Sequence, residues 1–177
     1  LGVKYFNAFN VDNLLLQVEY NQVRPYTYSH NTQVLNYAHF NQPMAHLWGA
    51  NFKEFVLIGR YNYKRWFGDA KFIIGQRGLD YNTDDDNVSY GGDIYRDYNS
   101  RNADTGIEIG QGNKTNSFVT ELQAGYLLNP ATNLKVFSTI IYRDFNPDAI
   151  TPSAMDSRTL WFSIGLRTDL FNWYNDF

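Results

Sequence analysis

The sequence predicts an all-β fold: the C-terminal portion, about seven antiparallel strands, of a transmembrane β-barrel with long extracellular loops. Three observations lead to this prediction: apolar and polar residues alternate in several segments, the connections between these segments alternate in length, and aromatic residues gather at segment ends. The chain has no apolar run of the roughly 18 residues that a membrane-spanning helix needs, which excludes a helical membrane protein.

The clearest alternation covers residues 53–64. One face carries apolar residues and the other polar ones: Phe55, Leu57, Gly59, Tyr61 and Tyr63 against Glu54, Arg60, Asn62 and Lys64. The same pattern predicts strands at residues 14–24, 117–128 and 158–171. Less regular patterns predict strands at residues 3–9, 69–78 and 134–144, where Ile73, Phe137 and Ile141 fall on the polar face. Each such strand suits a sheet with lipid on one side and water on the other.

The connections are short at residues 10–13, 65–68 and 129–133, and longer at residues 25–52, 79–116 and 145–157. Outer-membrane barrels have tight periplasmic turns and extended extracellular loops, whereas a soluble Tyr-rich sheet, the alternative, has no reason to separate them. We therefore expect residues 1–171 to belong to one barrel domain with the three longer loops outside the cell, and residues 172–177 to form a C-terminal tail. Because a single-chain barrel needs at least about eight strands, we expect further strands before Leu1.

Composition excludes several kinds of function. The absence of Cys removes disulfides, thiolate metal sites and Cys nucleophiles. With 15 basic and 18 acidic residues the net charge is -3, so no basic field attracts nucleic acid. No motif of a hydrolase is present, and we expect no enzymatic activity.

Two groups of residues carry side chains of the kind that bind metal ions. The three histidines share the loop at residues 25–52 without a spacing that enforces ligand geometry, so we expect them to form hydrogen bonds within an ordered loop. An acidic run supplies the hard oxygen atoms that Ca²⁺ takes, although it lacks the pattern of an EF-hand; its candidate ligands are Asp84, Asp85, Asp86 and Asp93. A solvated charge cluster is the alternative, and we expect no other cofactor.

The loop at residues 25–52 interleaves aromatic rings with Asn, Gln and His. Sugars offer apolar C–H faces and many hydroxyl groups, so this composition is typical of a sugar-binding surface. It is equally typical of an ordered loop that satisfies its own hydrogen bonds. The candidate ligand-binding residues are Tyr26, Tyr28, His30, Tyr37, His39, Asn41, Gln42, His46, Trp48 and Asn51.

The same stretch resembles a signature of the capsule-assembly Wzi family of barrels, which includes RemB-like gliding-motility proteins. That signature is RPYTYSH followed by NYxHxNQPxAHxxGANFxE, and the sequence has RPYTYSH at residues 24–30 and NYAHFNQPMAHLWGANFKE at residues 36–54. Met44 and the pair Leu47 and Trp48 depart from the more usual Leu and Pro-Leu. The resemblance implies that these strands end a larger barrel of about eighteen strands.

The resemblance also implies a function: a non-catalytic protein of the Gram-negative outer membrane that engages surface polysaccharide or supports surface-protein or gliding-motility machinery. Its implied partners are outer-membrane lipid and either polysaccharide or other cell-surface proteins. The alternative is a transport channel or porin for small anionic solutes, because bases on the predicted inward face outnumber acids eight to five. These residues are Lys4, Arg60, Lys64, Lys71, Arg77, Lys135, Arg143 and Arg167 against Glu19, Glu54, Asp69, Glu121 and Asp169.

Overall fold

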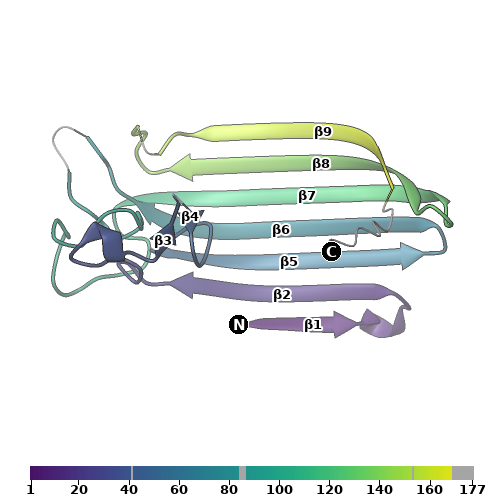
Figure 1. The fold of residues 1–177 in the computed structure, drawn as a ribbon, viewed down its shortest axis with the longest axis horizontal. Coiled ribbons are helices and arrows are strands. Elements are labelled where there is room, and N and C mark those ends of the chain that lie inside the picture. The colour runs from purple at the N-terminus through teal and green to yellow at the C-terminus, as the bar shows by residue number, and fades with distance from the viewer. Residues whose placement is uncertain (41, 84–86, 153, 169–177) are drawn as a thin grey trace, which may run out of the picture.

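The computed structural model describes residues 1–40, 42–83, 87–152 and 154–168. Its main element is one open antiparallel sheet of seven strands in the order β1-β2-β5-β6-β7-β8-β9, so that β1 and β9 form its two edges (Figure 1). The strands are β1 Gly2–Phe6, β2 Leu14–Val23, β5 Phe52–Tyr63, β6 Trp66–Leu79, β7 Asn113–Asn129, β8 Leu134–Pro147 and β9 Ser157–Arg167. The predicted all-β antiparallel architecture and its seven strands are confirmed, and the sheet is not closed.

The connections separate by length, as the sequence predicted. Tight turns join β5 to β6 and β7 to β8 at one end of the sheet, hereafter the turn end (Figure 1). Three longer connections gather at the opposite loop end: the first loop (residues 24–51), the second loop (80–112) and the third loop (148–156). The first loop contains the 3-10 helix η2 Gln33–Leu35 and a small hairpin of β3 Ala38–His39 and β4 Gln42–Pro43. Among the described residues, no helix is long and apolar enough to cross a membrane.

Several predicted strand bounds are wrong: β6 begins at Trp66 rather than residue 69, β7 begins at Asn113 rather than residue 117, and β8 ends at Pro147 rather than residue 144. The first and last strands are shorter than predicted. The first strand ends at Phe6 rather than residue 9, because Asn7 and Phe9 adopt left-handed backbone angles and Ala8–Asn10 forms the 3-10 helix η1. Left-handed residues cannot continue a strand. The last strand ends at Arg167 and Thr168 is not in a strand, while the rest of the predicted strand, from residue 169, lies outside the described residues.

Strand register gives the sheet one continuous apolar face. Residues paired across neighbouring strands point to the same side, so each register row belongs to one face. Two neighbouring apolar rows run across the sheet: Val3, Val18, Leu57, Phe72, Thr120, Tyr142 and Leu160, then Tyr5, Leu16, Gly59, Ala70, Leu122, Ile140 and Phe162. Large side chains on this face are exposed, with 58% of Ile74 and 60% of Phe162 accessible. At the turn end, the rings of Trp66 and Tyr126 pack 4.9 Å apart.

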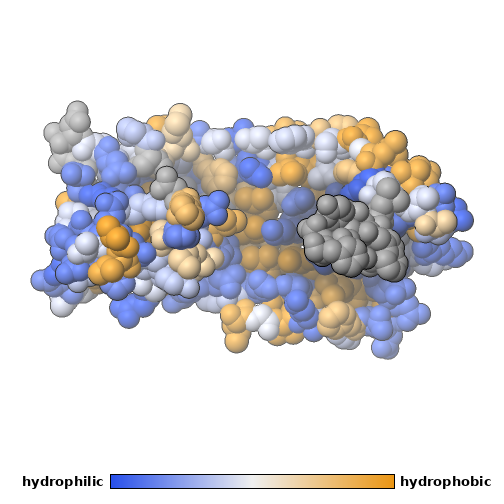
Figure 2. All heavy atoms as spheres, in the orientation of Figure 1, coloured by the Kyte–Doolittle hydropathy of each residue, from blue (hydrophilic) through white to orange (hydrophobic). Residues whose placement is uncertain are grey.

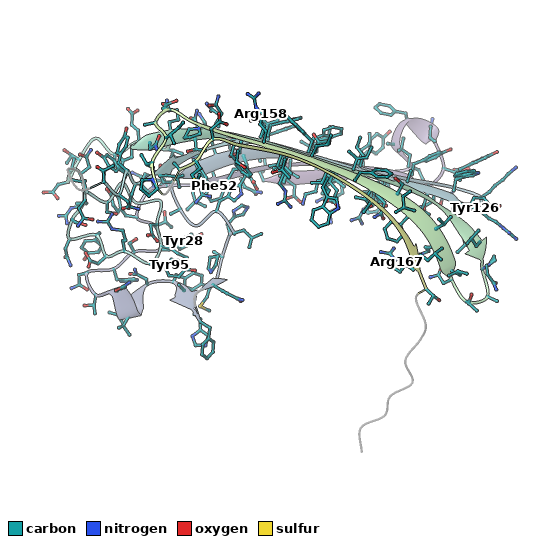
Figure 3. The ribbon with its side chains drawn as sticks, turned by 90° about the horizontal axis from the view of Figure 1, so that it is seen from above. Tyr28, Phe52, Tyr95, Tyr126, Arg158 and Arg167 are labelled. Atoms are coloured by element: carbon teal, nitrogen blue, oxygen red, sulfur yellow. The ribbon has the colours of Figure 1, made fainter. Side chains whose placement is uncertain are left out.

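The opposite face is mixed in polarity and concave, and the loops curl over it (Figure 3). One of its rows joins Lys4, Gln17, Ile58, Lys71, Glu121, Ile141 and Trp161. The strand residues predicted to point inward share this face, apart from Asp169, which lies outside the described residues. Ile73 fits here because it lies between Val56 and Val119 in the register, in a small apolar row.

Burial is concentrated at the loop end. A single-layer sheet cannot bury either face by itself, and the loops supply the second layer over one part of the concave face. Ala50, Phe52 and Ile94 are buried there, together with the polar residues Asn51 and Asn113. Hydrophilic residues cover much of the surface of this layer (Figure 2). In the part of the chain that the structure describes, extensive packing beyond the sheet is therefore found at the loop end, where the candidate site lies.

Candidate functional site

Asn51 joins the first loop to the second. Its side chain is completely buried. The amide nitrogen Nδ2 donates to the carbonyl oxygens of Gly78, Tyr90 and Gln111 at 3.1, 3.1 and 2.9 Å. The oxygen Oδ1 accepts from the backbone N–H of Gly110 at 2.7 Å. Its backbone is left-handed, with φ of 57°, a conformation that Asn tolerates better than most residues. Asn51 therefore holds the end of β6 together with the second loop at Tyr90 and at its last residues, Gly110 and Gln111.

Two further residues of the first loop bind the second loop. The hydroxyl of Tyr26 donates to the Ser89 carbonyl at 2.6 Å, and burial raises the pKa of this hydroxyl above its ordinary value. Asn36 donates from Nδ2 to the Ile94 carbonyl at 2.9 Å, while its Oδ1 accepts from the His30 backbone N–H at 2.6 Å. These side chains satisfy buried backbone groups that lie more than 50 residues away in the sequence.

The third loop is attached through the first residue of β7. Asn113, which is completely buried, donates from Nδ2 to the Ala149 carbonyl at 2.6 Å and accepts from the Ala149 N–H at 3.0 Å. This two-point bond resembles one step of a sheet ladder. The first and second loops therefore form one hydrogen-bonded layer at the loop end, and the third loop is bonded to the start of β7.

A cluster of rings anchors the first loop to β5. His46 stacks on Phe52 with ring centroids 4.4 Å apart, and Trp48 meets Phe52 edge to face at 5.6 Å. The Nε2 atom of His46 lies 2.9 Å from Oε1 of the buried Glu54, which also accepts from Asn21 Nδ2 at 2.8 Å. Burying a carboxylate without hydrogen-bond partners costs free energy. The hydrogen bonds to Glu54 offset this cost.

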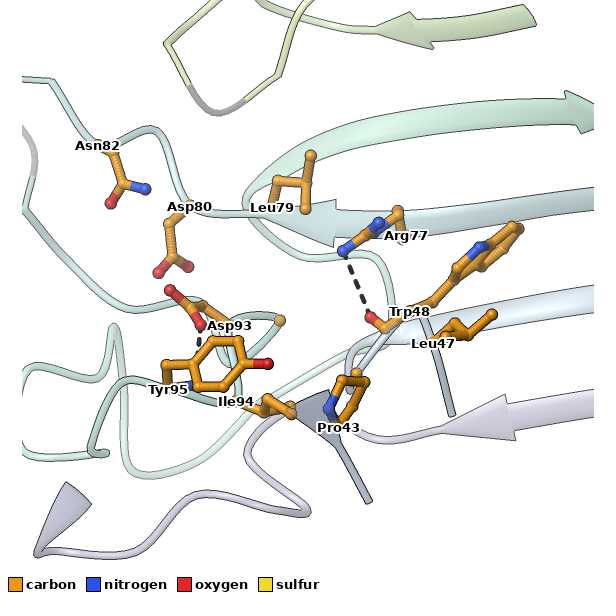
Figure 4. Close-up of a pocket in the computed structure, with 12 residues that line it drawn as sticks. Pro43, Leu47, Trp48, Arg77, Leu79, Asp80, Asn82, Asp93, Ile94 and Tyr95 are labelled. Atoms are coloured by element: carbon orange, nitrogen blue, oxygen red, sulfur yellow. Dashed lines mark hydrogen bonds between the residues drawn. The ribbon is translucent and has the colours of Figure 1, made fainter. Parts of the chain in front are cut away.

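Trp48 lies against β6 because position 75 has no side chain. A Cβ atom at Gly75 would overlap the Trp48 ring. Arg77, two residues further along the same face of β6, donates from a guanidinium nitrogen to the Trp48 carbonyl at 3.4 Å (Figure 4). Trp48 is therefore held by contacts with both β5 and β6.

A pocket of about 200 Å³ opens beside Trp48, between the first loop, the second loop and the end of β6 (Figure 4). It is lined by Pro43, Leu47, Trp48, Gly49, Arg77, Leu79, Asp80, Asn82, Gly92, Asp93, Ile94 and Tyr95. Trp48 and Arg77 lie toward one side of it, and Asp80 and Asp93 lie toward the other, with their carboxylates near each other. We call this the loop pocket.

The carboxylates of the loop pocket differ in their surroundings. The side chain of Asp80 is 1% exposed, accepts from the Tyr90 N–H at 2.7 Å and lies 2.9 Å from an Arg96 guanidinium nitrogen. Burial raises the pKa of Asp80 above its ordinary value, and the nearby Asp93 adds to this, although the Tyr90 N–H and Arg96 act in the opposite direction. Asp93 accepts from the Tyr95 N–H at 2.8 Å.

The chemistry of the loop pocket suits a polyhydroxylated ligand. The Tyr95 ring offers a flat apolar surface, against which the C–H face of a sugar ring packs. Asp93 supplies a charged acceptor for hydroxyl groups, and hydrogen bonds to charged groups are the stronger ones. A pocket with ring faces and a few polar groups is the usual form of a small-ligand site.

The structure divides the predicted ligand-binding residues into three groups. Trp48 lines the loop pocket. Tyr26, His46 and Asn51 bond or stack within the loop layer, and Tyr28 stacks on Tyr37 at 5.6 Å. His30, His39 and Gln42 are exposed, and Asn41 lies outside the described residues. One predicted residue therefore lies at a pocket, and several others form contacts within the loops themselves.

The pocket residues Arg77, Asp80, Asn82 and Tyr95 were not among the predicted ligand-binding residues. Arg77 could have been found, because a tight turn after Tyr63 sets a register that places Arg77 opposite Phe52. Tyr95 and Asn82 carry no such signal, since their positions depend on how the second loop folds.

The calcium prediction rests largely on Asp84, Asp85 and Asp86, which lie outside the described residues. Asp93 is described and lines the loop pocket. Within the described ranges, no three His, Asp or Glu side chains are grouped so as to hold a metal ion.

Comparisons with known proteins add no relative. No family model matches the chain, no curated protein matches it, and no solved structure matches its fold.

Proposed function

We propose that this chain is part of a transmembrane β-barrel of the bacterial outer membrane, which engages surface polysaccharide at its loop end or supports surface-protein or gliding-motility machinery, without catalysis. One observation carries the proposal: an apolar face crosses all seven strands, opposite a concave face of mixed polarity that folded loops cover at one end (Figure 3). Lipid outside and a polar interior beneath loops is the arrangement of a membrane barrel.

The dimensions of the sheet support the membrane part of the proposal. Strands β5 to β9 are 11 to 17 residues long, and a tilted membrane strand needs about 9 to 11. Soluble monomers rarely expose large continuous apolar patches, yet this face exposes Phe55, Ile74, Leu160 and Ile164 by 43 to 73%. Lipid contact gives these side chains an apolar environment.

The loop pocket and the resemblance of residues 24–54 to the Wzi family support the polysaccharide part. The most similar segment forms one wall of the pocket, through Pro43, Leu47, Trp48 and Gly49. In the same segment, Asn51 and His46 hold that wall in place. The segment thus both builds the layer and contributes to the site.

The test uses the complete protein in lipid nanodiscs with surface polysaccharide purified from the source bacterium. We expect binding that Trp48→Ala weakens about tenfold, because the wall of the loop pocket loses the ring that holds it against β5 and β6. Trp66→Ala at the turn end is the matched control and should leave binding unchanged. A large, steady conductance of the complete barrel, with no affinity for polysaccharide or a protein partner, would instead favour a transport channel.

A further inference from the structure

The apolar face of the sheet gives way to a polar row at the loop end. Its last row with large apolar side chains contains Tyr20, Phe55, Ile74, Phe118, Asp144 and Arg158. The next row of the same face, nearer the loops, is Gln22, Lys53, Gln76, Asn116 and Asn146. Lys114 follows one row further on, opposite Gly78. Every second residue of a strand shares a face, so successive rows are about 7 Å apart.

A hollow of about 260 Å³ lies across this change in polarity. Its apolar lining is Phe55 and Ile74, and its polar lining is Tyr20, Lys53, Gln76 and Asn116. Glu54 and Gly75 also line it, but they belong to a row of the concave face, where the Glu54 carboxylate is bonded to Asn21 and His46. We call this hollow the boundary site.

We propose that the boundary site binds a phosphorylated lipid, with an acyl chain over Phe55 and Ile74 and its phosphate group at Lys53. The inference rests on the proposed membrane location, and it concerns a surface that shares no residue with the loop pocket. The proposed function puts the loop end outside the cell, so the lipid belongs to the outer leaflet of the membrane.

The charge of this end of the apolar face is positive. Lys53 and Lys114 are exposed there, and the row below them adds Arg158 and Asp144. Asp144 lies 3.4 Å from Arg158 in an ion pair, and Figure 3 shows Arg158 on the convex side. The acid of these rows is thus matched with one base, and two lysines remain. Lysine stems lie along apolar surface while their ammonium groups reach the head groups, and basic residues at this level attract anionic lipids.

The neutral side chains of the polar row present hydrogen-bond donors. Gln76 donates from Nε2 to Asn116 Oδ1 at 3.1 Å, which uses the Asn116 oxygen and leaves its amide N–H groups as donors. The Tyr20 hydroxyl donates to Gln22 Oε1 at 2.8 Å, with the same consequence for the Gln22 amide. Phosphate oxygens are acceptors, and their hydrogen bonds to charged donors are the strong ones. Amide N–H groups beside the Lys53 ammonium therefore suit a phosphate group.

The experiment measures lipid binding to the complete protein in uncharged dodecyl maltoside micelles by native mass spectrometry. The probes are diphosphoryl lipid A, dioleoylglycerol, which has acyl chains without phosphate, and inorganic phosphate, which has no chains. We expect lipid A to bind at least about tenfold more tightly than either of the others. Lys53→Gln should weaken lipid A binding about tenfold, as expected for one lost charged contact, and Lys53→Arg should retain it. Lys71→Gln, an equal charge change on the concave face, is the matched control.

Three results would overturn the proposal. Equal binding of lipid A and dioleoylglycerol would mean that the hollow takes any apolar chain. Equal weakening by Lys53→Gln and Lys71→Gln would mean that net charge acts without a site. Binding of inorganic phosphate as tight as that of lipid A would mean that the acyl chains contribute nothing.

Insertion into phosphatidylcholine vesicles separates this proposal from the proposed function. A protein that inserts but does not prefer lipid A contradicts the boundary site alone, whereas a protein that does not insert contradicts the membrane location and the boundary site together. Trp48→Ala should leave lipid A binding unchanged, so a failure of the polysaccharide proposal is also measured separately.

Discussion

His46 joins Glu54 to Trp48 through its two ring nitrogens. The Nδ1 atom accepts from the Trp48 backbone N–H at 3.1 Å, while Nε2 lies 2.9 Å from Glu54 Oε1. An accepting Nδ1 carries no proton, so the proton belongs to Nε2, which donates to the carboxylate. One imidazole thus connects the concave face of β5 to a wall of the loop pocket.

Replacing His46 with Ala should loosen the first loop. The change removes both bonds and the stack on Phe52, and leaves the buried Glu54 with its hydrogen bond from Asn21. Removing one hydrogen-bond partner of a buried charged group lowers stability by about 1 to 3 kcal/mol. Hydrogen exchange of the Trp48 and Gly49 amides should accelerate accordingly. His30→Ala removes an exposed ring from the same loop, and equal acceleration in that variant would argue against the role of His46.

Asn51→Ala should be the most damaging single change in the loop layer. It removes four hydrogen bonds to the end of β6 and the second loop, among them the acceptor of the Gly110 N–H, while the Tyr90 carbonyl keeps its bond from Gln111. With each unsatisfied group costing about 1 to 3 kcal/mol, we expect a loss of at least about 3 kcal/mol in loop stability. Limited proteolysis of the second loop measures it. The exposed Gln42→Ala serves for comparison, and an Asn51→Ala variant as resistant as that one would contradict the assignment.

Gly75→Ala should displace Trp48, whereas Gly59→Ala should be tolerated. At position 75 the added methyl group overlaps the Trp48 ring, but at position 59 its nearest neighbour is a Leu16 methyl at 3.6 Å. Overpacking of this kind costs about 1 to 3 kcal/mol. Fluorine NMR of protein labelled with fluorotryptophan can follow the Trp48 signal in both variants. A Trp48 signal unchanged in Gly75→Ala would show that the ring does not need this contact.

The two faces should respond differently to Arg. Leu57→Arg and Phe162→Arg place a charge on the apolar face, which near the middle of a membrane costs about 2 to 4 kcal/mol. Asn62→Arg and Ser163→Arg place the same charge on the concave face and should cost far less. Unfolding by urea in lipid vesicles gives the four values. Equal costs on both faces would rule out membrane insertion.

Asp80 should make the loop layer less stable as pH rises. Because burial raises the folded-state pKa above the ordinary 3.8, the protonated form is favoured in the folded protein. The stability that it contributes is present below pH 3.8 and is lost as pH rises through the raised pKa. Asp80→Asn keeps an acceptor for the Tyr90 N–H without ionising. The stability of the natural protein minus that of Asp80→Asn should therefore fall between pH 3.8 and neutrality, measured by proteolysis of the second loop. A difference that rises would mean that the Arg96 ion pair outweighs burial.

The sequence by itself determined the seven strands and the residues on each face. Period-2 alternation is local, and a tight turn such as the one after Tyr63 transmits the register to the next strand, so Leu57 and Phe72 are matched without knowledge of distant contacts. The sequence also indicated that the stretch from Arg24 to Glu54 is ordered, because its rings and amides can bond to one another.

Only the tertiary structure decided which residues of that stretch line a site and which hold it. Asn51 and Trp48 are both predicted ligand-binding residues. In the structure, however, Asn51 is completely buried and Trp48 lines the loop pocket. The same holds for Tyr95, which reaches the pocket through the fold of the second loop. The reason is physical: these positions depend on hydrogen bonds between residues tens of positions apart, and loop backbone without a repeating pattern carries no periodicity that could reveal those partners.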